Sequence, residues 1–193
     1  FMGIGEPFDN YDAVLQAVRV LNEPVGMPIG ARRITLSTSG VIPGIRRLAG
    51  EGLQVELAVS LHAPDDELRS ALMPINRRYP LADLIAACGA YTRQTRRIIT
   101  FEYTLIRDVN DAPDLARALA RLLGAFPCRV NLIPLSPVPE YPREAATPET
   151  LDLFLDVLTR AGINATMRFS RGKGVNAACG QLRRAAARKE PAP

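Results

Sequence analysis

The stretch IITFEYTLIRDVNDAPDLARALARLLGAFPCRVNLI, residues 98–133, decides the fold. Its first part, Ile98 to Leu105, is rich in β-branched and aromatic residues and predicts a strand. A helix is expected from Pro113 to Leu123, with proline in its first turn, where the missing amide proton costs nothing. Arg129 to Ile133 predicts a second strand. A strand, a connecting helix and another strand in this order indicate two parallel strands.

The same alternation continues on both sides of this stretch. Further strands are expected over 33–37, 55–60 and 165–169, and further helices over 14–21, 45–51, 66–72, 81–95 and 147–161. The last helix begins with a Thr147 cap and Pro148 and ends at Gly162. Five prolines between Pro134 and Pro148 predict an irregular surface loop. The pattern predicts an α/β fold with a parallel sheet, either open and doubly wound or a complete or partial barrel.

Composition is typical of a globular protein. The chain has 193 residues, of which 47% are hydrophobic and 23% charged, so one domain with a sizeable core is expected. No run of roughly eighteen apolar residues and no signal segment occurs, so we expect a cytoplasmic protein without a membrane partner. The net charge of +4 permits contact with a polyanion through a local basic patch. Three scattered cysteines argue against a disulfide framework.

Polar residues collect where the expected strands end. Glu6, Ser37, Ser60 to His62 and Asn131 each stand at or just beyond the carboxyl end of a strand, the edge at which parallel α/β folds build their sites. Each also has a structural explanation, because such residues begin loops, cap turns or bond backbone groups. His62 is the only histidine, and no carboxylate or serine lies at triad spacing from it. It is therefore a better candidate for orienting a ligand or closing a hydrogen-bond network than for a general base.

Cys179 lies in the run NAACGQL, residues 176–182, among small residues that let a ligand or a base approach its thiol closely. Gly180 gives the neighbouring backbone unusual freedom. The alternative is packing, because free cysteine is commonly a small core residue. Cys88, within an apolar helix, and Cys128, just before a strand, are expected to be packing residues.

Five short motifs occur in a familiar order. They are GIGEP (3–7), STSG (37–40), SLHAP (60–64), NLIP (131–134) and AACGQL (177–182), with the run MPINRRYP (73–80) between them. Through these motifs the chain resembles the RlmN/Cfr family of radical S-adenosylmethionine RNA methyltransferases over almost all of its length. Five ordered motifs are specific, whereas Gly-Glu-Pro alone would be weak. The RlmN branch, which modifies C2 of adenine, is the closer match, and the Cfr branch, which acts at C8, is the alternative.

The resemblance implies a fold and a set of site residues. The fold is a partial TIM-type (β/α)6 radical SAM barrel, truncated at the N-terminus, with a barrel core over 1–182 and a basic tail over 183–193. The residues that match the family's S-adenosylmethionine site are Gly5, Glu6, Ser37, Ser60, Leu61, His62 and Asn131. Cys179 matches the cysteine that the family methylates on sulfur. A second S-adenosylmethionine then yields a 5′-deoxyadenosyl radical, which takes hydrogen from that methyl group, and the resulting methylene radical adds to the adenine ring.

The implied radical chemistry needs a 4Fe-4S cluster, held in this superfamily by a CxxxCxxC run. No two cysteines of this chain are that close. The family carries the run, a catalytic glutamate and a second cysteine ahead of the Gly-Glu-Pro motif, so all are expected upstream of Phe1. Phe1 and Met2 look like the end of a strand that also begins upstream. We therefore expect a fragment that cannot assemble the cluster or turn over when isolated.

The implied substrates are 23S rRNA and tRNA, and a separate electron donor would serve the cluster. Arg171 and Lys173 are candidate phosphate contacts because they neighbour Cys179. They belong to the run RGKGVN, residues 171–176, where many family members have acidic residues. Two interpretations from other classes stay open. One is a non-catalytic RNA-binding remnant, and the other is a phosphate-handling barrel isomerase or aldolase, for which a glycine-rich phosphate loop is not evident.

Overall fold

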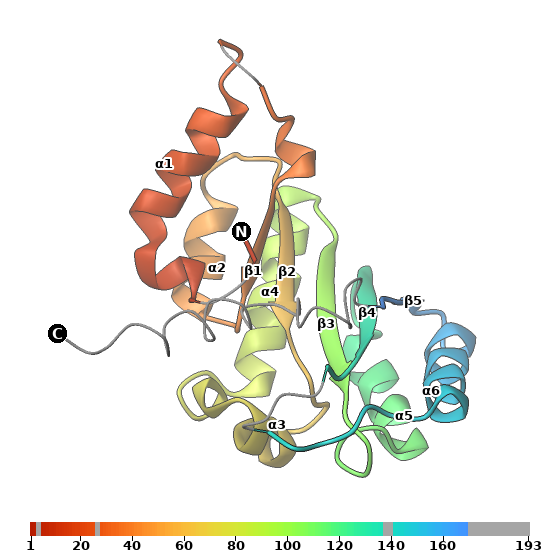
Figure 1. Ribbon diagram of the computed structural model, residues 1–193. Coiled ribbons are helices and arrows are strands. Elements are labelled where there is room, and N and C mark those ends of the chain that lie inside the picture. The colour runs from red at the N-terminus through yellow and green to blue at the C-terminus, as the bar shows by residue number, and fades with distance from the viewer. Residues whose placement is uncertain (3–4, 26–27, 137–140, 170–193) are drawn as a thin grey trace, which may run out of the picture.

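Five parallel strands form a single sheet whose spatial order is the order of the sequence (Figure 1). The computed structural model describes residues 1–2, 5–25, 28–136 and 141–169. The strands are β1 (Thr35–Thr38), β2 (Glu56–Ser60), β3 (Ile99–Leu105), β4 (Cys128–Pro134) and β5 (Asn164–Met167). All four neighbouring pairs are parallel. An order without reversal is the order of a barrel wall rather than of a doubly wound sheet.

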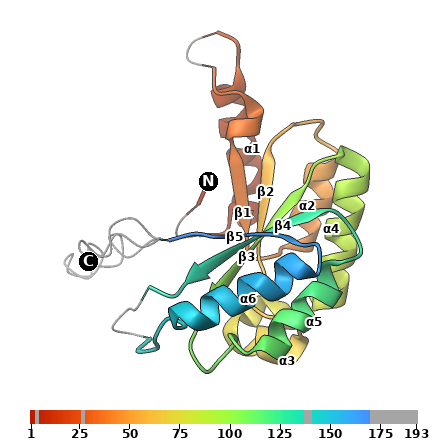
Figure 2. The same cartoon turned by 90° about the vertical axis from the view of Figure 1, so that its right-hand side faces the viewer.

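Helices connect the strands and cover one side of the sheet. The α-helices are α1 (Tyr11–Asn22), α2 (Ile42–Ala49), α3 (Asp66–Leu72), α4 (Leu81–Thr95), α5 (Pro113–Leu123) and α6 (Pro148–Arg160). Short 3-10 helices occur at η1 (Pro7–Asn10), η2 (Ala31–Arg33) and η3 (Pro74–Arg77). Figure 2 shows α2, α4, α5 and α6 on the same side. The expected alternation of strands and helices is confirmed.

Several boundaries differ from the sequence-based expectation, among them the start of the first strand and the end of the last one. Arg33 was expected in a strand, but the backbone there closes a turn, with the Arg33 amide donating to the Gly30 carbonyl at 2.8 Å. The last strand ends at Met167 rather than Phe169. Thr147 caps α6 through a bond from the Thr150 amide, and Gly162 adopts a positive φ of 79° after it, as expected.

The two faces of the sheet differ in polarity because strand side chains alternate. Residues such as Leu57, Phe101 and Leu132 are almost fully buried and belong to the hydrophobic core under the helices. The opposite face carries Ser37, Ser60, Glu102 and Asn131, in strands β1 to β4 respectively. The last three stand side by side in register. The helix-free face is therefore a polar surface.

Phe1 lies beside β1 and makes the backbone bonds of a parallel strand. Its amino group donates to the Thr35 carbonyl at 2.7 Å, and the Ser37 amide donates to the Phe1 carbonyl at 3.2 Å. Phe1 therefore occupies the place of a sixth strand beside the five described ones. This arrangement agrees with the expected partial (β/α)6 barrel. None of the helices in the described part of the chain has the length and hydropathy needed to cross a membrane.

Candidate cofactor site

A cavity of about 570 Å³ opens at the edge of the sheet where β1 and β2 end. It is lined by Phe1, Met2, Gly5, Glu6, Pro7, Asn10, Val14, Ser37, Thr38, Ser39 and Ser60. Its volume lies within the roughly 300–1,000 Å³ that is typical of small-molecule sites. Four of the predicted cofactor residues, at positions 5, 6, 37 and 60, are brought together here. The predicted residues at 61, 62 and 131 do not line it.

Glu6 closes one side of the cavity by holding the loop after β1. Its Oε2 accepts hydrogen bonds from both the amide and the hydroxyl of Ser39, each at 2.7 Å. Its Oε1 accepts from the Phe8 amide at 3.1 Å and so caps η1. The carboxylate therefore links two segments that are 33 positions apart in the sequence.

Two glycines make this geometry possible. Gly5 has a φ of +102°, a region that residues with a side chain rarely adopt. Gly44, in α2, lies directly under Phe8, and a Cβ at this position would stand 2.4 Å from the Phe8 ring. Close contact between α2 and η1 thus sets the position of the segment that carries Glu6.

Ser37 and Ser60 present hydroxyl groups to the cavity from the ends of β1 and β2. Both residues are half-buried. Within the ranges that the structure describes, neither hydroxyl has a hydrogen-bond partner in the protein, so both can bond a ligand. Thr38 serves the fold instead, because its Oγ1 accepts from the amides of Gly40 and Val41 at 3.1 and 3.3 Å.

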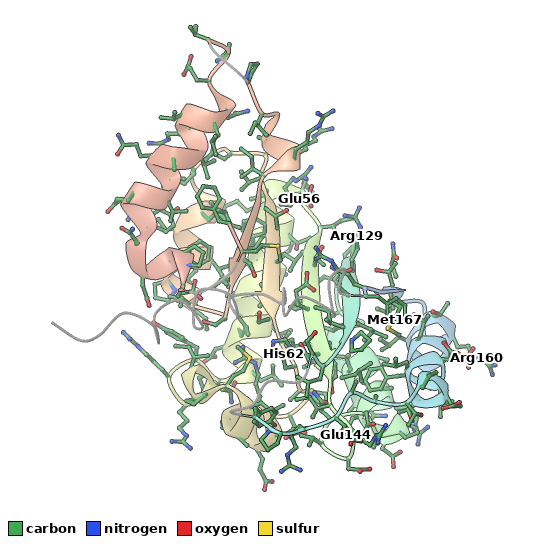
Figure 3. All side chains as sticks on the ribbon, in the orientation of Figure 1. Glu56, His62, Arg129, Glu144, Arg160 and Met167 are labelled. Atoms are coloured by element: carbon green, nitrogen blue, oxygen red, sulfur yellow. The ribbon has the colours of Figure 1, made fainter. Side chains whose placement is uncertain are left out.

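His62, which is labelled in Figure 3, occupies a strained position after β2 and closes a hydrogen-bond network. Its φ is +61°, and its Nδ1 accepts from the Thr104 amide at 3.0 Å. Since Nδ1 is an acceptor, the ring carries its proton on Nε2. Burial, together with the nearby Arg69 guanidinium, lowers the pKa of His62 to about 4. The imidazole is therefore neutral at pH 7, with Nδ1 already committed.

Leu61 contributes shape rather than a polar group. Its side chain is fully buried. Its amide donates to the Glu102 carbonyl at 3.0 Å, and its carbonyl accepts from Arg69 Nε at 3.2 Å.

Asn131 joins a row of side chains that crosses β3, β4 and β5. Its Nδ2 donates to Glu102 Oε1 at 2.9 Å, and its Oδ1 accepts from Thr166 Oγ1 at 3.0 Å. These two bonds fix the orientation of the amide. Asn131 bonds side chains here rather than the backbone groups that a strand-end role would use.

Glu102 and Arg69 escaped the sequence-based search. Glu102 is 5% exposed, and burial raises the pKa of its carboxyl group. Its Oε2 has no partner in the described part of the chain. A sequence signal for Glu102 exists, since it interrupts an otherwise apolar and aromatic strand. Arg69 gives no such signal, because its helix is polar and only the tertiary structure buries it.

The described residues do not fit an iron–sulfur cluster. Cys88 and Cys128 are both buried, as expected for packing residues. Burial raises the pKa of Cys88 to about 12 and that of Cys128 to about 11, so both stay protonated thiols. No group of three metal-ligating side chains occurs among the residues described.

The other predicted site residues lie outside the described residues. These are Cys179, Arg171 and Lys173, together with the predicted boundary between the core and the basic tail at 182 and 183.

Comparison with known proteins shows which superfamily the chain belongs to. The Radical SAM superfamily model matches residues 1–120. The chain therefore belongs to the radical SAM superfamily.

Similar proteins within the superfamily show which family of methyltransferases the chain resembles. The chain is 53% identical over 189 residues to a probable dual-specificity RNA methyltransferase RlmN of Symbiobacterium thermophilum, covering 97% of this chain and 51% of that protein. A protein of the same name from Chloroflexus aurantiacus is 53% identical, with 94% of this chain and 50% of that protein covered. The resemblance to the RlmN/Cfr family is thus confirmed. The chain spans about half the length of these relatives.

Solved structures agree with the fold. A radical SAM methyltransferase from Sphaerobacter thermophilus superposes with a TM-score of 0.91 at 56% identity, covering 94% of this chain and 53% of that one. A domain of the pyruvate-formate lyase-activating enzyme from Bacteroides vulgatus superposes with a TM-score of 0.60 at 16% identity, covering 87% of this chain and 99% of that domain, and it supports the fold alone.

Proposed function

We propose that this chain forms the cofactor-binding part of a radical SAM RNA methyltransferase that methylates C2 of adenine in 23S rRNA and in tRNA. The observation that carries the proposal is the cavity at the carboxyl edge, where Gly5, Glu6, Ser37 and Ser60 come together from three separate motifs. Relatives at about half identity carry the name probable dual-specificity RNA methyltransferase RlmN.

The lining of the cavity supports S-adenosylmethionine as its ligand. The hydroxyls of Ser37 and Ser60 would bond its polar groups, and Gly5 leaves room for close approach of the backbone. We also assign His62 and Asn131 to the cofactor site, on the resemblance to the family, although neither lines this cavity. When bound, the cofactor supplies the methyl group and, with a 4Fe-4S cluster, radical chemistry.

We propose that the cluster is held outside this chain, since no CxxxCxxC run occurs in the sequence and the described residues offer no group of three metal-ligating side chains. We assign its CxxxCxxC ligands, the catalytic glutamate and the second cysteine to a segment ahead of Phe1. The isolated chain would then neither bind the cluster nor catalyse the reaction. A separate electron donor would reduce the complete enzyme.

Cys179 is assigned as the methyl carrier. C2 of adenine is electrophilic, so direct methyl transfer to it from a sulfonium is unfavourable. A cysteine that holds the methyl carbon beside the base instead gives that carbon a high effective concentration. Arg171 and Lys173 would contact RNA phosphates near the thiol. A base within folded RNA would have to leave its stack to reach it. We also propose a cytoplasmic location, since the proposed RNA substrates are found there.

The test is methylation of 23S rRNA fragments and tRNA by the full-length protein with its cluster reconstituted. We expect 2-methyladenosine by mass mapping, loss of product in Cys179→Ala and retention of product in the control Cys128→Ala. Methylation at C8 would replace the proposal by the Cfr-type activity. Absence of any methylated adenine from cluster-loaded protein would favour a non-catalytic RNA-binding role.

A further inference from the structure

Three consecutive backbone carbonyls at the end of β2 are held by buried side chains. The Ser60 and Leu61 carbonyls accept from Arg69, at 3.1 Å from Nη2 and 3.2 Å from Nε respectively. The His62 carbonyl accepts from Asn110 Nδ2 at 2.9 Å. This segment leaves the sheet just where Ser60 lines the cavity. Its backbone direction is therefore set by two side chains from outside the strand.

Arg69 also reaches the loop after β1. Its Nη2 donates to the Ser39 carbonyl at 2.8 Å, and its Nη1 donates to Asn76 Oδ1 at 2.8 Å. Ser39 is the residue whose amide and hydroxyl bond Glu6. Arg69 therefore bonds the carbonyl of Ser39, while Glu6 bonds its amide and hydroxyl. Together they connect the Glu6 segment, the β1 loop and the end of β2 around one cavity.

The burial of Arg69 has to be compensated by hydrogen bonds, because a buried charge is costly. Its exposure is 0%, and no carboxylate of the described residues lies within ion-pair distance of it. Burying an arginine without an ion-pair partner is costly, and four donated hydrogen bonds, three of them to backbone carbonyls, offset this cost. What an apolar residue cannot do is hold several carbonyls in fixed directions.

Gly40 gives Arg69 access to the Ser39 carbonyl. Its φ is +107°, and a Cβ there would stand 3.1 Å from Arg69 Nη2 and 3.0 Å from Leu84 Cδ2. The glycine therefore keeps the guanidinium's path to the loop open.

Asn110 holds the last of the three carbonyls, that of His62, at the end of the Ser60–His62 segment. It is fully buried, and besides the His62 carbonyl its Nδ2 donates to the Thr104 carbonyl at 2.7 Å. Its Oδ1 accepts from the Ile106 amide at 2.7 Å. With the bond from the Thr104 amide to the imidazole, these contacts hold His62 in its left-handed conformation.

We propose that Arg69 and Asn110 are positioning residues of the cofactor site, which fix the Ser60–His62 and Ser39 backbones so that the cavity is preorganised for S-adenosylmethionine. The inference rests on the proposed role of this cavity. Neither residue touches the cavity itself, so each acts through the segments that it holds.

The test compares full-length holoprotein with Arg69→Lys, which keeps the charge but not the fork of donors. The matched control is Arg77→Lys, an exposed arginine nearby. Two measurements are made: hydrogen exchange without ligand, and the Kd for S-adenosylmethionine with the rate at saturating cofactor. We expect faster exchange confined to residues 37–41 and 60–64, a Kd raised at least tenfold and a saturated rate changed less than threefold.

A purely structural role would give a different result. Exchange would then rise across all core strands, and the Kd of the folded fraction would stay within twofold of wild type; either result overturns the inference. Should Arg69→Lys fail to fold, Asn110→Asp tests the same claim, since it keeps the acceptor for Ile106 but loses at least one donor. Wild-type holoprotein that fails to bind S-adenosylmethionine would refute the proposed function, while the exchange pattern would still decide whether Arg69 sets the backbone.

Discussion

The bond between Glu6 and Ser39 gives the sharpest test of how the cavity is built. The Glu6 carboxylate accepts three hydrogen bonds, two of them from Ser39. Hydrogen bonds to a charged group contribute about 1.5–3 kcal/mol each, and half-buried donors regain part of this from water. We therefore expect Glu6→Ala to lower the free energy of unfolding by about 2–3 kcal/mol.

The partner substitution removes only one of these bonds. Ser39→Ala loses the hydroxyl but keeps the amide, so it is expected to cost about 1 kcal/mol. In the double variant the Ser39 hydroxyl has already lost its acceptor, so the total should equal that of Glu6→Ala within about 0.5 kcal/mol. The non-additivity is the signature of direct contact.

Urea unfolding of the four proteins, followed by circular dichroism, measures these energies. Glu67→Ala, which removes an exposed carboxylate in α3, is the matched control and should stay within about 0.5 kcal/mol of wild type. Strictly additive losses for Glu6→Ala and Ser39→Ala would refute the reasoning, because they would mean that the two side chains act independently.

Two further predictions follow from His62 and Gly44. Because the folded pKa of about 4 lies below the ordinary 6.5, His62 destabilises the fold as pH falls from 6.5 towards 4, by up to about 3 kcal/mol. His62→Gln should therefore flatten the fall in unfolding free energy between pH 7 and 5, and an unchanged slope would contradict the assignment, since no other histidine is present. Gly44→Ala places a Cβ against the Phe8 ring and should lower the free energy of unfolding by about 1–2 kcal/mol. The cost of overpacking exceeds the gain in helix propensity from replacing glycine by alanine. The control Gly50→Ala, whose Cβ would meet only the Arg47 carbonyl at 3.5 Å, should be neutral or slightly stabilising. Equal melting curves for the two variants would contradict the prediction, because they would mean that Phe8 moves aside without cost.

The order of strands and helices could be predicted from sequence because each element carries a local signal. The strand through Phe101 and Tyr103 is apolar and aromatic. Helix α5 begins at Pro113, and α6 begins at Pro148 after its Thr147 cap. Boundaries were less accurate where the backbone forms short turns. Arg33 was expected to begin a strand, but its amide donates to the Gly30 carbonyl three positions earlier, and the Ile34 amide donates to the Ala31 carbonyl.

The cavity could be predicted in part, since strand ends on parallel strands share one edge. Positions 5, 6, 37 and 60 meet there as expected. The contacts that hold it could not be predicted, because Arg69 lies in a polar helix and meets Ser39 only through the fold. Asn110 likewise sits in a loop of ordinary turn composition, and its burial depends on strand β3 and on the segment after β2.

The central claim is that the cavity at the ends of β1 and β2 holds S-adenosylmethionine. Photo-cross-linking of labelled S-adenosylmethionine to the full-length holoprotein, with the modified peptides identified by mass spectrometry, tests it most directly. We expect label in peptides that contain Glu6, Ser37–Ser39 or Ser60–His62, competed by unlabelled cofactor. A second cavity of about 420 Å³ is lined by Asp108, Val109, Asp111, Ala112, Pro113 and Thr150, and competable label found there instead would contradict the account.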